Sequence, residues 1–228
     1  MKLTKLSVIL PAVLISSVAF AQQPTYVNAS GGINPRYATE KKAESQAAQG
    51  SQYYIETFNP AKIDDSNEVN LVRYNAYTDE LEMKVNDEIL VLQPKDNQII
   101  KLVNNTASYE YVAYTDKENI TQQHYLVLVS DNPNLKIYKK ERITLIPEQQ
   151  PTGGYQKYKA PMYKKLDPEY YIKMNDGQVV YMSDKKKDVI GLIPGKESAL
   201  KDFIKENRIS TSDDEDLKKL GNYMSTLL

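Results

Sequence analysis

The sequence predicts an α+β protein: a mostly antiparallel β-sheet, built from meanders and hairpins, followed by two short C-terminal helices. Three observations support this. The chain has 18 Tyr against 3 Phe and no Trp, and tyrosine favours strands in which one edge packs and the hydroxyl reaches water. From residue 51 onward, apolar and polar residues alternate as in half-buried strands. Near the C-terminus the apolar period changes to that of an amphipathic helix.

The N-terminus predicts a secretory signal peptide over residues 1–21. Lys2 and Lys5 precede an apolar run that is too short and too interrupted for a membrane span, and the run ends in the small-x-small pattern Ala19-Phe20-Ala21. The alternative is an uncleaved N-terminal anchor. No cysteine follows the run, so a lipoprotein signal is excluded. We expect the protein to be exported to the periplasm or to the periphery of an outer membrane.

Residues 22–50 are predicted to be a flexible linker. They are rich in Pro, Gly, Gln, Ser and Ala and contain few large apolar side chains. A segment of this composition cannot bury enough apolar surface to offset the loss of chain entropy. We therefore expect the folded part of the chain to begin near residue 51.

A β-rich body is predicted over residues 51–184. A strand over residues 51–58 should lead into a turn at Pro60. Along residues 70–85 the buried side of the alternation changes within residues 77–80. A strand cannot change its buried face without a bulge or bend, so we expect a bulged strand there.

The motif Tyr-x-Ala-Tyr-Thr-Asp occurs twice, and one constant offset aligns residues 74–100 with residues 111–137 without a gap. Such a period is typical of a supersecondary unit used more than once, and we expect a duplicated three-strand unit. Chance similarity of two tyrosine-rich strands is the alternative. A functional interpretation would be a ligand site that uses one Tyr and one Asp from each copy, namely Tyr77, Asp79, Tyr114 and Asp116. The duplication and the change of buried face favour the structural interpretation.

The last part of the chain contains a hairpin and a helical segment. Asp176-Gly177 suits a two-residue type I′ turn, which would pair Met174 with Val179. Residues 185–228 are predicted to be helical. Ser212 and Glu215 have the spacing of a capping box at the start of the last helix, whose apolar stripe contains four residues: Leu217, Leu220, Met224 and Leu227.

Composition makes several chemistries improbable. The chain has no cysteine and one histidine, His124, so thiolate and histidine-cluster metal sites are excluded, and we expect His124 at a strand edge. No phosphate-binding glycine loop is present, and the charges nearly balance, with 29 Lys+Arg and 30 Asp+Glu. We therefore expect no nucleotide, no nucleic-acid partner and no cofactor. The acidic stretch 64–68 lacks the spacing and glycine of an EF-hand and is at most a weak calcium ligand.

One segment combines cations with aromatic rings. It could hold an anionic polymer, a lipid head group or a glycan; the alternative is a solvated edge strand whose lysines discourage edge-to-edge pairing. Lys185, Lys186 and Lys187 could extend it. The candidate binding residues are Tyr155, Lys157, Tyr158, Lys159, Tyr163, Lys164 and Lys165.

The stretch LVRYNAYTDELEM resembles a group of exported proteins of unknown function that are common in Bacteroidota envelopes. Members tend to carry an RYN-x-Y-x-DE-x-E strand, a Lys-rich stretch, an ALKDFIKEN-like helix and a D/E-D-L-KKL helix. Here these motifs are residues 73–82, 185–187, 199–207 and 215–220. The resemblance implies an envelope location and a body of sheet plus helices. It implies no activity and no catalytic residues.

These observations predict a non-enzymatic cell-envelope protein that acts by binding another envelope or outer-membrane protein. A specific version is an accessory subunit of an outer-membrane assembly or secretion complex. The alternative is a module that binds glycan, peptidoglycan or lipid through residues 155–165. A third hypothesis is a carboxylate-based hydrolase, which would require two acids that face each other across one pocket.

Overall fold

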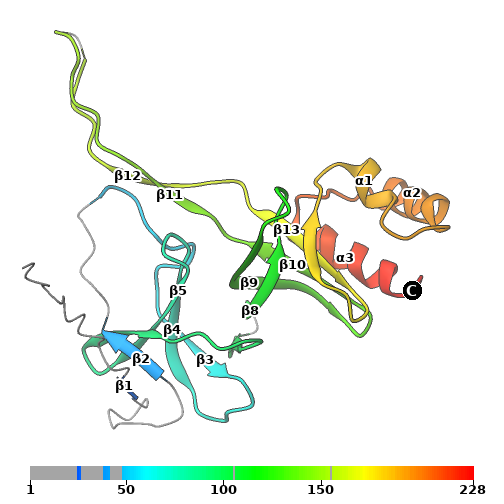
Figure 1. Cartoon of the computed structure of the whole chain (residues 1–228), viewed down its shortest axis with the longest axis horizontal. Coiled ribbons are helices and arrows are strands. Elements are labelled where there is room, and N and C mark those ends of the chain that lie inside the picture. The colour runs from blue at the N-terminus through cyan, green and yellow to red at the C-terminus, as the bar shows by residue number, and fades with distance from the viewer. Residues whose placement is uncertain (1–24, 27–37, 42–47, 105, 155) are drawn as a thin grey trace, which may run out of the picture.

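The computed structural model describes residues 25–26, 38–41, 48–104, 106–154 and 156–228. The predicted signal peptide, residues 1–21, lies outside the described residues. The α+β fold class is confirmed: strands dominate the chain, their pairing is mostly antiparallel, and the helices follow at the C-terminus (Figure 1).

The first half of the chain forms an antiparallel sheet. Its strands follow the order β1-β2-β6-β5-β4-β3-β7, and β7 pairs with β8 of the second half. The strand bounds are β1 Thr25–Tyr26, β2 Ala38–Lys41, β3 Asn59–Ile63, β4 Asn70–Asn75, β5 Glu80–Val85, β6 Glu88–Leu92 and β7 Ile99–Leu102. Alternate residues of these strands bury one face, where Ile63, Val72 and Leu81 lie in the core.

The second half forms a closed ring of five strands. β8 (Ser108–Thr115) pairs with β9 (Thr121–Asn132), β9 with β10 (Leu135–Lys140), β10 with β13 (Glu169–Met174), β13 with β14 (Val179–Met182), and β14 with β8. The last pair is parallel and joins only Val179 to Tyr114 and Val180 to Thr115. This small barrel is filled by side chains that alternate inward, including Tyr114, Tyr138 and Tyr171.

Within the described residues, the C-terminal segment forms three helices rather than the predicted two. They are α1 (Lys186–Ile190), α2 (Glu197–Glu206) and α3 (Asp214–Ser225). Helix α3 packs against β9 and β10, α1 contacts α2, and all three lie at the barrel end of the molecule (Figure 1). The additional helix is the single turn α1 in the lysine-rich stretch. The predicted apolar stripe of α3 is confirmed for Leu217, Leu220 and Met224, which are fully buried. Leu227 follows the end of α3 and is half-buried.

The predicted capping residue of α3 was one position too early. The N-cap is Asp213, whose side chain accepts a hydrogen bond from the Asp216 N–H at 3.0 Å. Ser212 lies before the cap. Aspartate and serine are about equally good N-caps, so the sequence alone does not decide between neighbouring candidates.

The two motif copies adopt different structures. In the first, β4 ends at Asn75, whose side-chain oxygen accepts hydrogen bonds from the Tyr77 and Thr78 N–H groups at 3.1 and 3.2 Å. The corresponding residue of the second copy is Val112, which cannot make this turn, and β8 continues to Thr115. The predicted bulged strand is therefore wrong: residues 76–79 form a hairpin turn between β4 and β5, and this turn changes the buried face.

Three further expectations are corrected. Residues 51–58 form no extended strand apart from a single bridge between Tyr53 and Asn75, and Pro60 lies within β3 instead of in a turn. Most of the predicted linker, residues 22–50, lies outside the described residues, but its described part includes β1 and β2, and β2 pairs with β6. Backbone pairing with an established sheet recruits this segment despite its polar composition.

The predicted hairpin exists, but its register is shifted by one residue. Ile172 pairs with Val180, and Tyr171 pairs with Tyr181. The Gly177 N–H donates to the Met174 carbonyl, which closes a turn that begins at Asn175, where φ is 51°. Asparagine tolerates this left-handed conformation, and the turn therefore starts one residue earlier than Asp-Gly suggested.

Candidate functional site

A two-stranded ribbon projects from the molecule. It consists of β11 (Ile143–Ile146) and β12 (Met162–Lys165), which pair antiparallel and are separate from the large sheet. The ribbon leaves the barrel, passes the N-terminal sheet and continues beyond it to a tip (Figure 1). Past the strands, Gln149 and Lys159 exchange two backbone hydrogen bonds of 2.9 and 3.1 Å, so the pairing extends toward the tip.

The base of the ribbon is fixed to the body by tyrosines. The Tyr54 hydroxyl accepts a hydrogen bond from the Arg142 N–H (3.3 Å) and donates to the Leu166 carbonyl oxygen (3.1 Å), which joins the two ends of the ribbon. The Tyr163 ring packs edge to face against Tyr77, with ring centroids 5.1 Å apart. Lys165 lies over the Tyr54 ring. The base is therefore rigidly positioned, whereas the tip makes no such contacts among the described residues.

The outer edge of β12 is covered at its start by the N-terminal segment. The Gln49 N–H donates to the Pro161 carbonyl, and the Gln49 carbonyl accepts from the Tyr163 N–H, both at 2.8 Å. Gly50 follows with φ at 78°, and a Cβ there would lie 2.8 Å from the Tyr163 carbonyl oxygen. Only glycine allows the chain to turn away at this point without strain.

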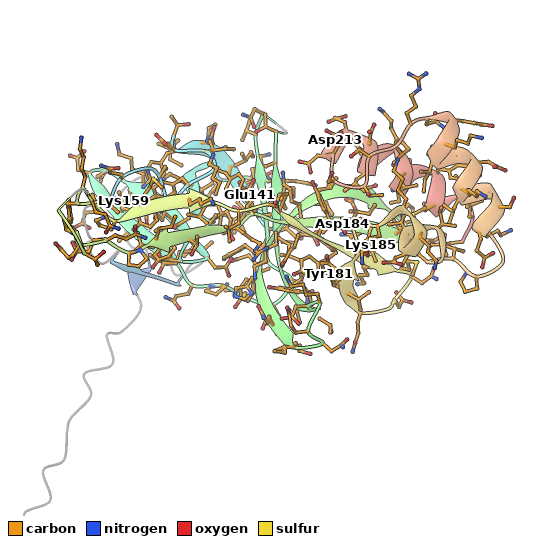
Figure 2. The ribbon with its side chains drawn as sticks, turned by 90° about the horizontal axis from the view of Figure 1, so that it is seen from above. Glu141, Lys159, Tyr181, Asp184, Lys185 and Asp213 are labelled. Atoms are coloured by element: carbon orange, nitrogen blue, oxygen red, sulfur yellow. The ribbon has the colours of Figure 1, made fainter. Side chains whose placement is uncertain are left out.

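The structure divides the predicted Tyr/Lys site into two parts. Tyr163 and Lys165 face the body at the ribbon base, and Lys164 is exposed on the opposite face. Lys157, Tyr158 and Lys159 lie near the tip, and Lys159 and the helices are at opposite ends of the molecule (Figure 2). Tyr155 is outside the described residues. The two parts lie at different points along the ribbon, and within the base, strand alternation places Lys164 on the face opposite Tyr163 and Lys165.

The distal ribbon carries a partly apolar hollow of about 430 Å³, lined by Ile146, Pro147, Tyr158 and Met162 among others. Tyr158 is 51% exposed and Met162 is 39% exposed. The Tyr158 hydroxyl donates to Glu148 at 3.0 Å, which orients the ring beside the hollow. Exposed Tyr and Met next to a hollow are typical of surfaces that receive a partner's side chain.

A second cluster of titratable groups lies between the sheet and the barrel. The Tyr114 hydroxyl is 2.8 Å from His124 Nδ1 and accepts a hydrogen bond from Lys140 Nζ. His124 Nε2 lies 3.9 Å from Asp79 Oδ2. Burial raises the pKa of Asp79 to about 7, and burial beside Lys140 lowers the pKa of His124 to about 4. His124 is therefore neutral at pH 7, and Asp79 titrates near neutrality.

This cluster contains three of the four motif residues that the functional interpretation combined. Asp79 and Tyr114 meet through His124, and Gln122 joins Tyr114 to Asp116 with hydrogen bonds of 3.1 and 2.7 Å. Tyr77 is not part of it, because it packs on the ribbon. His124 pairs with Val112 of β8, and the other side of β9 pairs with β10 only from Val127 onward, in agreement with the expected position at a strand edge. No local sequence signal indicated that Lys140 belongs to this cluster, because only the pairing between strands places it there.

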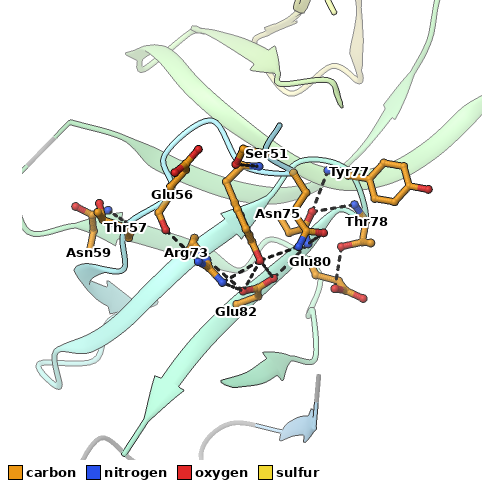
Figure 3. A network of polar contacts seen from close by, with 12 residues as sticks. Ser51, Glu56, Thr57, Asn59, Arg73, Asn75, Tyr77, Thr78, Glu80 and Glu82 are labelled. Carbon is orange, nitrogen blue, oxygen red and sulfur yellow. Dashed lines mark hydrogen bonds and ion pairs between the residues drawn. The ribbon is translucent and has the colours of Figure 1, made fainter. Parts of the chain in front are cut away.

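A third polar group is structural. Arg73 donates to Glu82 Oε2 at 2.6 Å, and Tyr53 and Asn75 donate to Oε1 at 2.9 and 3.2 Å (Figure 3). The Arg73 guanidinium lies between the Tyr53 and Phe58 rings. Every carboxylate oxygen of the fully buried Glu82 thus has a donor, so this network fastens residues 51–58 onto the outer face of the sheet.

No family model matches the chain, and neither a curated protein nor a solved structure shows significant similarity to it. Among the described residues, no helix has the length and apolar character needed to cross a membrane. No three or more His, Asp or Glu side chains of those residues gather as metal ligands would.

Proposed function

We propose that the chain is an exported cell-envelope protein that acts without catalysis by binding another envelope protein through its ribbon. The observation that carries the proposal is the ribbon itself. β11 and β12 extend beyond the body as a separate two-stranded sheet. An isolated pair of strands is marginal in water, so a partner surface would stabilise it.

The chemistry of the distal ribbon suits a protein partner. Tyr158 and Met162 offer exposed apolar surface beside the hollow of about 430 Å³. The edge of β11 is unpaired within the described part of the chain, and such an edge can accept a partner strand. A specific form of the proposal is an accessory subunit of an outer-membrane assembly or secretion complex, which rests on the expected compartment alone.

The proposal is tested by site-specific crosslinking in the envelope. A photo-reactive amino acid at position 158 should give one crosslinked membrane-protein adduct, and the same group at Ile120, an exposed residue of the β8–β9 turn, should give none. Tyr158→Ser with Met162→Ser should abolish co-purification of that partner, whereas Val103→Ser with Ile120→Ser should preserve it. A chain that purifies alone, or a partner that the ribbon variant still binds, would refute the proposal.

The alternative is binding of an anionic glycan, peptidoglycan or lipid by the ribbon lysines. Lys157 and Lys159 near the tip and Lys164 on the outer face are exposed. Their replacement by Ala should remove a salt-sensitive affinity for an anionic polymer if this alternative holds. Lys165 should be left intact, since it packs on Tyr54. Absence of binding at low salt would exclude the alternative.

A further inference from the structure

A polar cavity of about 410 Å³ lies where α3 meets the N-terminal sheet and the barrel. Strands β7, β8, β9 and β10, the segment between β10 and β11, and the first turns of α3 form its walls. Glu141, which lines it, is near the middle of the molecule, whereas Lys159 is at the far end of the ribbon (Figure 2). The cavity is thus independent of the proposed interaction surface.

The Glu141 carboxylate in this wall has too few hydrogen bonds and too distant a positive charge to offset its burial. The residue is 8% exposed, and its Oε1 lies 3.9 Å from Lys139 Nζ, which binds Asp214 at 2.5 Å instead. Glu141 Oε2 is buried and has no hydrogen-bond partner among the described residues. Burial outweighs the attraction of Lys139 and raises the pKa of Glu141 to about 7. A buried acceptor without a donor is costly and indicates that a donor is missing.

A second buried polar group that lacks a hydrogen-bond partner among the described residues lines the same cavity. Ser108 Oγ is buried and makes no hydrogen bond within the described part of the chain. Lys101 and Lys218 lie at the exposed rim with Asp214 and Glu215. The residues of the cavity wall therefore include one unpaired carboxylate oxygen and one unpaired hydroxyl, and the rim both donates and accepts hydrogen bonds.

We propose that this cavity binds a small amino sugar, whose ammonium group lies against Glu141 and whose hydroxyl groups bond Ser108 and the polar rim. An ammonium group supplies the hydrogen-bond donor that Glu141 Oε2 lacks and adds a positive charge to that of Lys139, and charge-assisted hydrogen bonds of this kind are strong. Sugar hydroxyls both donate and accept, as the mixed rim requires. The volume lies within the range of small-molecule sites.

Two other occupants fit less well. A metal ion would need several ligating side chains, and the described residues contain no group of three or more that could hold one. A neutral sugar would satisfy Ser108 but would bring no positive charge to Glu141, whose only close cation is Lys139 at 3.9 Å among the described residues. The ammonium group is therefore the feature that distinguishes the expected ligand.

The test compares D-glucosamine with D-glucose, which differ by one ammonium group in place of a hydroxyl. Binding is followed by NMR chemical shifts of the backbone amides of residues 106–109, 127–129 and 139–141, with each sugar titrated to tens of millimolar at neutral pH. We expect glucosamine to shift these amides and to bind at least about tenfold more tightly than glucose, the effect of one charged hydrogen bond.

Glu141→Gln should remove this preference, and Ser108→Ala should weaken the binding of both sugars. Glu148→Gln, the same change at an exposed glutamate of the ribbon, is the matched control and should leave the preference intact. Equal affinity for the two sugars would overturn the proposal. So would an absence of shifts at the cavity amides, or a preference that persists in folded Glu141→Gln.

Discussion

The Tyr163 ring at the base of the ribbon packs edge to face on Tyr77 in the β4–β5 turn, with ring planes 64° apart. This contact connects the first motif copy to the proposed interaction arm. Tyr77 lies in a turn outside the barrel, whereas its counterpart Tyr114 on β8 is buried inside. The turn thus supports the ribbon directly.

Removing either ring should loosen the ribbon base. In a double-mutant cycle of Tyr77→Ala and Tyr163→Ala, we expect a coupling free energy of about 0.5–1.5 kcal/mol, the usual value for such aromatic pairs. Urea denaturation measures this coupling free energy. Hydrogen exchange of the backbone amides of residues 143–146 and 162–165 should accelerate in both single variants. Strictly additive effects would show that the contact contributes nothing to holding the ribbon.

Comparing wild type with Asp79→Asn should show how much the buried charge of the Asp79 carboxylate lowers the free energy of unfolding. Because the folded pKa is raised to about 7, the folded chain binds the proton more tightly than the unfolded chain does. The wild-type free energy of unfolding should therefore fall as pH rises from about 4 to 7, relative to that of the variant. His124, Lys140, Tyr74 and Glu80 are the charged or titratable groups that act on this carboxyl.

The variant is expected to fold normally. Asn can still accept the hydrogen bonds that the Tyr74 hydroxyl and the Tyr125 N–H make to Asp79, and it tolerates the φ of 57° at this position. Urea denaturation at about pH 5 and pH 8 should show a gain for the variant on the order of 1 kcal/mol or more at the higher pH. A constant difference between the two chains would contradict the raised pKa.

Breaking the buried pair of Arg73 and Glu82 should be strongly destabilising. Arg73→Met leaves the fully buried Glu82 carboxylate without its cation, which should cost about 3–5 kcal/mol of the free energy of unfolding. Adding Glu82→Gln to Arg73→Met should recover part of this loss, because no buried charge remains. Chemical denaturation of wild type, Arg73→Met and the double variant measures these free energies of unfolding. An Arg73→Met variant as stable as wild type would show that the buried ion pair does not stabilise the fold.

Gly221→Ala tests the packing of α3. A Cβ at Gly221 would lie 2.8 Å from Ser130 Cβ, inside contact distance. We expect a loss of about 1–3 kcal/mol from overpacking, which exceeds the gain of about 1 kcal/mol in helix propensity. Asn222→Ala, at the next and exposed position, is the control and should not destabilise. Increased stability of Gly221→Ala in thermal unfolding would contradict this packing.

Local sequence signals predicted the helices and turns whose formation depends on residues close together in the chain. The apolar spacing of Leu217, Leu220 and Met224 predicted α3, and the turn residues near Asp176 predicted the last hairpin. The register of that hairpin was missed by one residue because Asn175 also accepts the left-handed conformation. The two motif copies were predicted to fold alike. They do not, because the Asn75 side chain closes a turn and its counterpart Val112 cannot.

The candidate sites depended on contacts that the sequence does not encode locally. Lys140 meets Tyr114 and His124 only because β9 and β10 pair and the barrel closes. Glu141 faces a cavity only because α3 packs beside it. Seven residues of the Tyr/Lys segment were predicted as one site, and strand alternation placed Tyr163 and Lys165 toward the body.

Periodicity and composition act over a few residues, so they were enough to predict the fold class, a helical C-terminal segment and the residue types available for chemistry. The parallel pairing of β14 with β8, the projection of the ribbon and the burial of Glu141 could not be predicted in this way. These features join residues far apart in the chain. Their free energy comes from packing between whole elements, which no local pattern records.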